Sequence, residues 1–141
     1  LDVDMHDTAA LRARATEILD RSRPAAVIFM GVLGHVADPD RARALLRRTL
    51  ELFPAGSHLV LADGTLPTDP EARRRVIQAQ QEYADTGAMA YWNRAAEEVA
   101  GFFDGLDLVA PGVVSIPLWR PGPDPGPPEH VDQYGGVARK S

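Results

Sequence analysis

Residues 24–64 limit the possible folds of this chain more than any other segment. Two short apolar runs, 25–30 and 58–62, flank a stretch in which apolar residues recur at helical spacing. Asp38 and Pro39 open that stretch with a capping side chain and a proline, which is typical of a helix start. A strand, a helix and a strand in this order predict a βαβ unit, with parallel strands and a right-handed crossover.

The turn after the first apolar run, residues 31–36 (GVLGHV), predicts a ligand site. In open α/β sheets, ligands bind at the carboxyl ends of the strands, and glycine lets the backbone approach a ligand closely. We therefore expect a nucleotide-like cofactor beside this turn. His35 adds an imidazole, a group that titrates near neutral pH and can orient a substrate or accept a proton. The alternative is a histidine that packs against the loop at the helix start.

Length and composition exclude several classes of protein. The 141 residues predict a single domain over 1–141. A net charge of -5 argues against a nucleic-acid partner or an anionic membrane surface. The absence of cysteine excludes disulfides and thiolate metal sites, and the histidines lack the spacing of metal ligands, so we expect no metal. No apolar run is long enough to span a membrane, and no signal peptide is visible, so we expect a cytoplasmic protein.

The remaining elements are expected from periodicity and turn residues. The chain opens without methionine on a strand-like alternation, so we expect an amino-terminal portion to precede it. The pattern predicts helices over 8–20 and 70–85 and one beginning at 93 or 94, and strands over 106–110, 113–119 and 134–139. Residues 120–130 are rich in proline and are expected to form a connector before the last strand.

Aromatic side chains gather around the loop before the last predicted helix. Tyr83, Tyr91 and Trp92, with Met89, would stack on a flat or cationic acceptor if this loop covers a site. We therefore expect the three aromatic residues to bind substrate, and ordinary packing of a surface loop is the alternative. Asp63 ends the second apolar run and is interpreted as part of an Asp-Gly turn, with a place in the site as the alternative.

Four segments of the chain resemble the carboxyl-terminal half of class I S-adenosylmethionine-dependent methyltransferases. The likeness is closest to an actinobacterial family catalogued as a domain of unknown function. The segments are VDMHD (3–7), VIFMGVLGHVAD (27–38), EEVAGFFDGLDLVAPGVVSIPLWRP (97–121) and YGGVARK (134–140). The resemblance implies an α/β fold: half of a doubly wound, Rossmann-like methyltransferase sheet, mostly parallel with an antiparallel terminal strand.

The resemblance also implies a cofactor and the residues that bind it. S-adenosylmethionine would be the methyl donor, S-adenosylhomocysteine the product, and a small molecule the acceptor. Asp4 and Met5 match the position that holds the adenine. The implied residues beside the methionine part are Met30, Gly31, Val32, Leu33 and His35.

Two other functions stay open because the glycine-rich cofactor loop of the family has no counterpart in this sequence. The chain could be a non-catalytic or truncated half that folds with another chain. It could also be a different Rossmann-like nucleotide-binding enzyme, such as an oxidoreductase. A half-sheet has an uncovered edge, so association into a homo-oligomer is expected to be possible.

Overall fold

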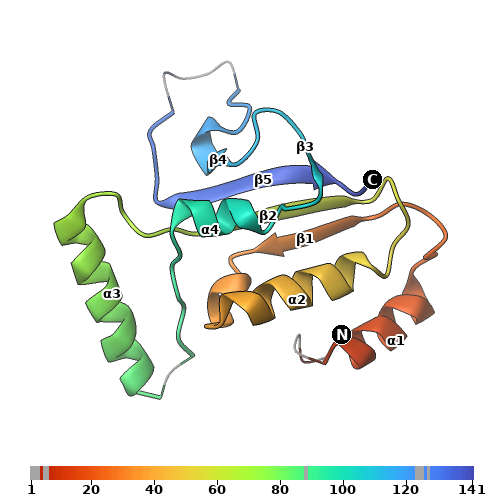
Figure 1. Ribbon diagram of the computed structural model, residues 1–141, viewed down its shortest axis with the longest axis horizontal. Helices are drawn as coiled ribbons and strands as arrows, with labels where there is room; N and C mark the ends of the chain where they lie inside the picture. The colour runs from red at the N-terminus through yellow and green to blue at the C-terminus, as the bar shows by residue number, and fades with distance from the viewer. Residues whose placement is uncertain (1–3, 5–6, 88, 123–125, 127) are drawn as a thin grey trace.

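The structure is a computed structural model that describes residues 4, 7–87, 89–122, 126 and 128–141. Helices and strands alternate along most of the chain (Figure 1). In chain order the elements are α1 (Thr8–Ile18), β1 (Ala26–Met30), the 3-10 turn η1 (Leu33–His35), α2 (Pro39–Leu50), β2 (His58–Gly64), α3 (Pro70–Asp85), α4 (Ala96–Gly101), β3 (Asp107–Leu108), β4 (Val114–Ser115), the 3-10 turn η2 (Ile116–Leu118) and β5 (Gln133–Arg139).

One mixed sheet organises these elements. Its strand order is β1-β2-β5-β3, and β4 pairs with the same strand β5. β1 and β2 run parallel, with Ala26 opposite His58, whereas β5 is antiparallel to β2, β3 and β4. The α/β fold class and the antiparallel terminal strand are therefore confirmed, and the parallel part among the described residues is the β1–β2 pair.

The βαβ unit forms as its local signals predict. The Asp38 carboxylate accepts hydrogen bonds from the amides of Asp40 and Arg41 at 2.8 and 3.3 Å, and Pro39 is the first helical residue. One face of α2 is buried and meets buried residues of the two parallel strands. The core contains Ala42, Leu45, Leu46 and Leu50 from α2, Val27 and Phe29 from β1, and Leu59 and Leu61 from β2.

The two faces of β1 have different surroundings. Val27 and Phe29 are buried, whereas Ile28 and Met30 on the opposite face are 62% and 54% exposed. β1 is also the first strand of the sheet order, so β2 is its one paired neighbour among the described residues. Both the outer edge and one face of this strand are thus open.

Four expectations about element bounds are wrong. The strands expected over 106–110 and 113–119 shrink to two residues each, and the second gives way to η2. Pro117 explains that change, because proline has no amide to donate to a strand ladder. The last helix begins at Ala96 rather than 93 or 94, since Arg94 forms a bridge to Thr65. The first helix ends at Ile18 instead of residue 20.

The helix α3 stands apart from the sheet (Figure 1). Its start is capped by Asp69, whose carboxylate accepts from the amide of Ala72 at 2.7 Å. None of its described side chains is buried. Within the described part of the chain, no helix has both the length and the apolar character that crossing a membrane requires.

Candidate functional site

The turn between β1 and η1 leaves its backbone open at one point. Gly31 has a φ of 63°, and its amide donates to the carbonyl of Ala62 at 2.8 Å. A Cβ placed on this glycine would meet no atom within 4 Å. The neighbouring Met30 is exposed and Val32 is half-buried. Space for a ligand therefore lies beside the carboxyl end of β1, as the parallel part of the sheet predicts.

Three residues of the turn, Leu33, Gly34 and Val36, are buried and face the core. Leu33 and Gly34 are buried, so the Leu33 side chain belongs to the hydrophobic core and does not line the open space. The Leu33 carbonyl accepts a hydrogen bond from Arg94 at 3.0 Å. Any contact of Leu33 with a cofactor would be limited to its remaining backbone atoms.

Arg94 is a buried cation at a position where the sequence predicts the start of a helix. Its side chain is 4% exposed, and its guanidinium donates to the carbonyls of Leu33, the first residue of η1, and Val36, the residue after it. The same guanidinium lies 3.5 Å from a carboxylate oxygen of Asp63. Arg94 thus ties the end of β2 to the turn that carries the predicted cofactor residues.

The buried Asp63 and the half-buried Tyr91 form a polar pair. Asp63 lies within β2 and is 1% exposed, so its interpretation as a turn residue is wrong. Its carboxylate accepts from the Tyr91 hydroxyl, which in turn accepts from the Gly64 amide at 2.9 Å. Burial raises the pKa of Asp63. Burial and the hydrogen bond to Asp63 raise the pKa of Tyr91 to about 12, so the proton stays on the tyrosine.

His35 is exposed, and the geometry determines which of its ring nitrogens carries a proton. Nδ1 lies 3.0 Å from the carbonyl oxygen of Ala90. A carbonyl only accepts hydrogen bonds, so a neutral imidazole here has its proton on Nδ1 and a lone pair on Nε2. The ring meets Tyr91 edge to face, with 5.2 Å between centroids. His35 is therefore prepared to accept a proton at Nε2.

The other predicted site residues are placed as follows. Asp4 is exposed and its carbonyl accepts from the amide of Asp7 before α1, while Met5 lies outside the described residues. Tyr83 is exposed on the last turn of α3. Trp92 is half-buried, and its amide donates to the Gly34 carbonyl at 2.8 Å, so it lies beside the turn. The predicted cofactor and substrate contacts of these residues stay predictions. The substrate contact predicted for Tyr91 also stays a prediction, and its hydroxyl is hydrogen-bonded to Asp63.

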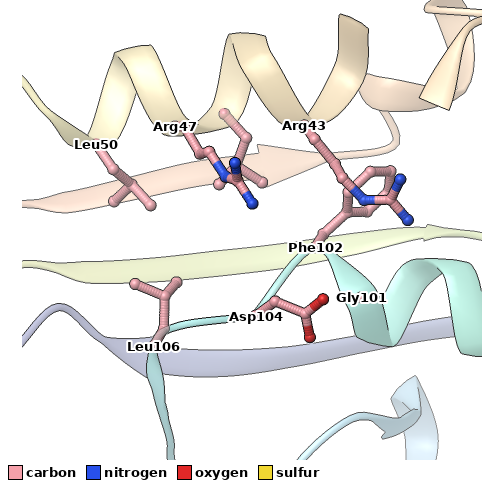
Figure 2. Close-up of a pocket in the computed structure, with 8 residues that line it drawn as sticks. Arg43, Arg47, Leu50, Gly101, Phe102, Asp104 and Leu106 are labelled. Carbon is pink, nitrogen blue, oxygen red and sulfur yellow. The ribbon is translucent and has the colours of Figure 1, made fainter. Parts of the chain in front are cut away.

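A small pocket between α2 and the end of α4 does not suit a cofactor. Figure 2 shows Arg43, Arg47 and Asp104 around it. Its volume is about 40 Å³, far below the roughly 300–1,000 Å³ of a typical ligand pocket. Arg43 pairs with Asp40 at 3.1 Å and lies over the Phe102 ring, 5.9 Å from the ring centre. These contacts indicate a structural role for the pocket.

A larger apolar groove lies on the other face of the sheet. Its volume is about 220 Å³. It is lined by Met30, Val60, Leu61, Ala62, Ile116, Trp119, Gly135, Gly136 and Val137. The described residues contain no group of three or more His, Cys, Asp or Glu side chains arranged to hold a metal ion.

Comparison with known proteins places this chain in a family. A family model described as S-adenosyl methyltransferase matches residues 1–141. A DUF574 family protein from Streptomyces avermitilis is 34% identical, with a TM-score of 0.84, and the match covers 100% of this chain and 54% of that one. No protein with curated annotation matches.

Two further solved structures support the same fold. A protein from Thermobifida fusca YX, reported as a candidate methyltransferase, is 26% identical over 98% of this chain and 52% of its own, with a TM-score of 0.78. An O-methyltransferase family 2 protein from Planctomyces limnophilus, solved with apigenin, is 17% identical with a TM-score of 0.52, covering 87% and 32% of the two chains.

The chain spans about half the length of the proteins from Streptomyces avermitilis and Thermobifida fusca. The full-length family match and the 34% identity over the whole chain confirm the resemblance seen in the sequence. The chain belongs to the S-adenosyl methyltransferase family, whose cofactor is S-adenosylmethionine.

Proposed function

We infer that the protein transfers the methyl group of S-adenosylmethionine to a small-molecule acceptor at the carboxyl ends of β1 and β2. The observation that carries this proposal is the turn itself: Gly31 leaves open space beside its backbone, and His35 lies four residues further on with Nε2 as its acceptor. The bound cofactor supplies a methyl group on a positively charged sulfur. The family match supports this donor.

On the cofactor side, the chain provides backbone and apolar surface. The methionine part of the cofactor would lie along Met30, Gly31 and Val32, because these residues at the end of β1 are at least partly accessible to solvent. Asp4 and Met5 would contact the adenine, as the resemblance implies. The energetic contribution of such a site is alignment of donor and acceptor together with exclusion of water.

On the acceptor side, His35 would serve as the general base. A hydroxyl group must lose its proton as its oxygen bonds to the methyl carbon, and Nε2 is the atom that takes this proton. Tyr83 and Trp92 would contribute aromatic surface against which an acceptor packs. The acceptor class that this arrangement favours is therefore a hydroxyl-bearing small molecule with a flat apolar body.

Binding of S-adenosylhomocysteine to the 141-residue chain, measured by calorimetry, tests the cofactor site. We expect saturable micromolar binding that is lost in Gly31→Val. Gly87→Val is the matched control, because Gly87 also has a positive φ, of 76°, and open space at its Cβ position. Valine strains the backbone similarly at both positions, so a difference in ligand binding between the two variants is due to the location of Gly31 in the site. Binding of NADH in place of S-adenosylhomocysteine would contradict the proposal and favour the oxidoreductase alternative.

A second candidate function is a methyltransferase half that acts only together with another chain. The open edge of β1, the exposed Ile28 and Met30, and the coverage of about half of the first two solved structures favour it. A folded chain that binds no S-adenosylhomocysteine and forms a dimer in light scattering would support this candidate. A folded monomer that binds the ligand would contradict it.

A further inference from the structure

The segment 90–94, here called the strap, crosses the carboxyl ends of β1 and β2. The Trp92 amide donates to the Gly34 carbonyl at 2.8 Å, and the Arg94 amide donates to the Gly64 carbonyl at 3.3 Å. The Ala90 carbonyl accepts from His35 Nδ1 at 3.0 Å. The strap therefore joins the end of β2 to the turn after β1, and its first carbonyl is the partner of the proposed base.

The Tyr91 ring sits tightly between two glycines. A Cβ on Gly34 would overlap this ring, and a Cβ on Gly64 would lie 3.0 Å from its Cε1 atom. The ring therefore lies directly against the backbone of η1 on one side and of β2 on the other. Any larger residue at either position would push the strap away from the turn.

The Tyr91 hydroxyl gives the strap its polar anchor. It donates to the buried carboxylate of Asp63 and accepts from the Gly64 amide at 2.9 Å. Hydrogen bonds to a buried charged group are stronger than neutral ones. Met89, the residue before the strap, is exposed. Gln80 from α3 donates a hydrogen bond to the Tyr91 carbonyl at 3.1 Å.

We propose that Tyr91 is a positioning residue that fixes the tautomer of His35 by holding the strap on Asp63. The peptide between Ala90 and Tyr91 is planar, so anchoring the Tyr91 side chain and backbone sets the direction of the Ala90 carbonyl. That carbonyl selects the His35 tautomer with the proton on Nδ1 and a lone pair on Nε2. The catalytic consequence rests on the proposed function, whereas the tautomer itself is a property of the folded chain.

The experiment is nitrogen-15 NMR of the histidine side chains in wild type, Tyr91→Phe and Tyr83→Phe. Tyr91→Phe keeps the ring and removes only the hydroxyl. Tyr83→Phe is the matched control, because Tyr83 is exposed on α3 and has no part in the anchor. We expect neutral His35 to carry its proton on Nδ1 in wild type and control, and Nε2–H to become the major form in Tyr91→Phe. His58 and His130 should be unchanged in all three proteins.

Hydrogen exchange of the Trp92 amide provides a second measurement on the same samples. Loss of a hydrogen bond to a charged group should speed this exchange about tenfold in Tyr91→Phe. An Nδ1–H tautomer that survives in Tyr91→Phe would overturn the proposal, and Trp92 exchange that is also unchanged would show that packing of the ring alone holds the strap. Asp63→Asn should give an intermediate effect, since an amide oxygen still accepts from the hydroxyl but carries no charge.

These readouts are independent of methyl transfer. If the chain binds no S-adenosylhomocysteine yet Tyr91→Phe changes the His35 tautomer, the positioning role holds and the proposed function fails. If the chain binds the ligand but His35 keeps its tautomer in the variant, the proposed function holds and the positioning role fails.

Discussion

We expect Arg94→Met to remove a large share of the stability of this chain. Methionine keeps an apolar stem but provides no donor. The variant would leave the buried Asp63 carboxylate without the guanidinium that now lies 3.5 Å away. It would also remove the donor to the carbonyls of Leu33 and Val36 at the start and after the end of η1.

The magnitude follows from the burial of both charged groups. Arg94 and Asp63 are 4% and 1% exposed, so water cannot replace the lost partner. Removing one member of a buried ion pair costs about 3–5 kcal/mol, against a total free energy of unfolding of about 5–15 kcal/mol for a typical domain. With a urea m-value of about 2 kcal/mol per M, the unfolding midpoint should fall by roughly 2 M.

Arg43→Met is the matched control for this measurement. Both arginines lie over the Phe102 ring, with 5.9 Å from Arg43 and 5.5 Å from Arg94 to its centre, so the loss of stacking is similar. Arg43, however, pairs with an Asp40 side chain that is 88% exposed, and exposed pairs contribute less than about 1 kcal/mol. Equal midpoints for the two variants would refute the argument that burial of the Arg94–Asp63 pair is decisive.

A double variant separates the uncompensated charge from the lost hydrogen bonds. Asp63→Asn removes the charge that Arg94→Met leaves unpaired. The combination should therefore be more stable than the sum of the single losses predicts, with a coupling of about 0.5–3 kcal/mol. Strict additivity would show that the two side chains, 3.5 Å apart, do not stabilise each other.

Three further predictions concern other parts of the fold. Above pH 10 the free energy of unfolding should fall by at most about 1.4 kcal/mol per pH unit. Burial and the hydrogen bond to Asp63 raise the pKa of Tyr91 to about 12, so this tyrosine ionises first in the unfolded chain. In urea unfolding, Tyr91→Phe should show a smaller fall. Gly135→Ala should destabilise by about 1–3 kcal/mol, since its Cβ would lie 2.6 Å from a β2 carbonyl oxygen, whereas Gly122→Ala, with open space, should leave the thermal midpoint unchanged. Asp38→Ala should cost about 1 kcal/mol in urea unfolding, because α2 loses its capping carboxylate.

Local signals were enough to predict the elements that support the site. The segment from β1 to β2 was predicted because its cap, its proline and its apolar spacing act within a few residues of each other. The turn at 31–36 was predicted to offer a ligand site because it follows a parallel strand. Gly31 has open space beside it, and the role of the turn as a ligand site stays a prediction.

Long-range contacts explain what the sequence analysis missed. Arg94 lies two residues before the start of α4, where the sequence predicts a helix start, but its partners lie about 30 and 60 residues earlier in the chain. Asp63 was interpreted as a turn because Asp-Gly is common in turns, yet pairing with β5 extends β2 through Gly64. The sequence contains no local signal for either contact, because each depends on the packing of separate elements.

The turn after β1 contains two sets of residues, one buried and one facing outward. Leu33, Gly34 and Val36 are buried, and the carbonyl of each accepts a hydrogen bond from Arg94 or Trp92 on the strap. Gly31 and His35 face outward, one beside open space and the other with its ring against the strap. The inner set fixes the turn, so the outer pair keeps its geometry before any ligand binds. Preorganisation of this kind lowers the cost of aligning reactants, which is the main contribution that methyl transfer requires from a protein.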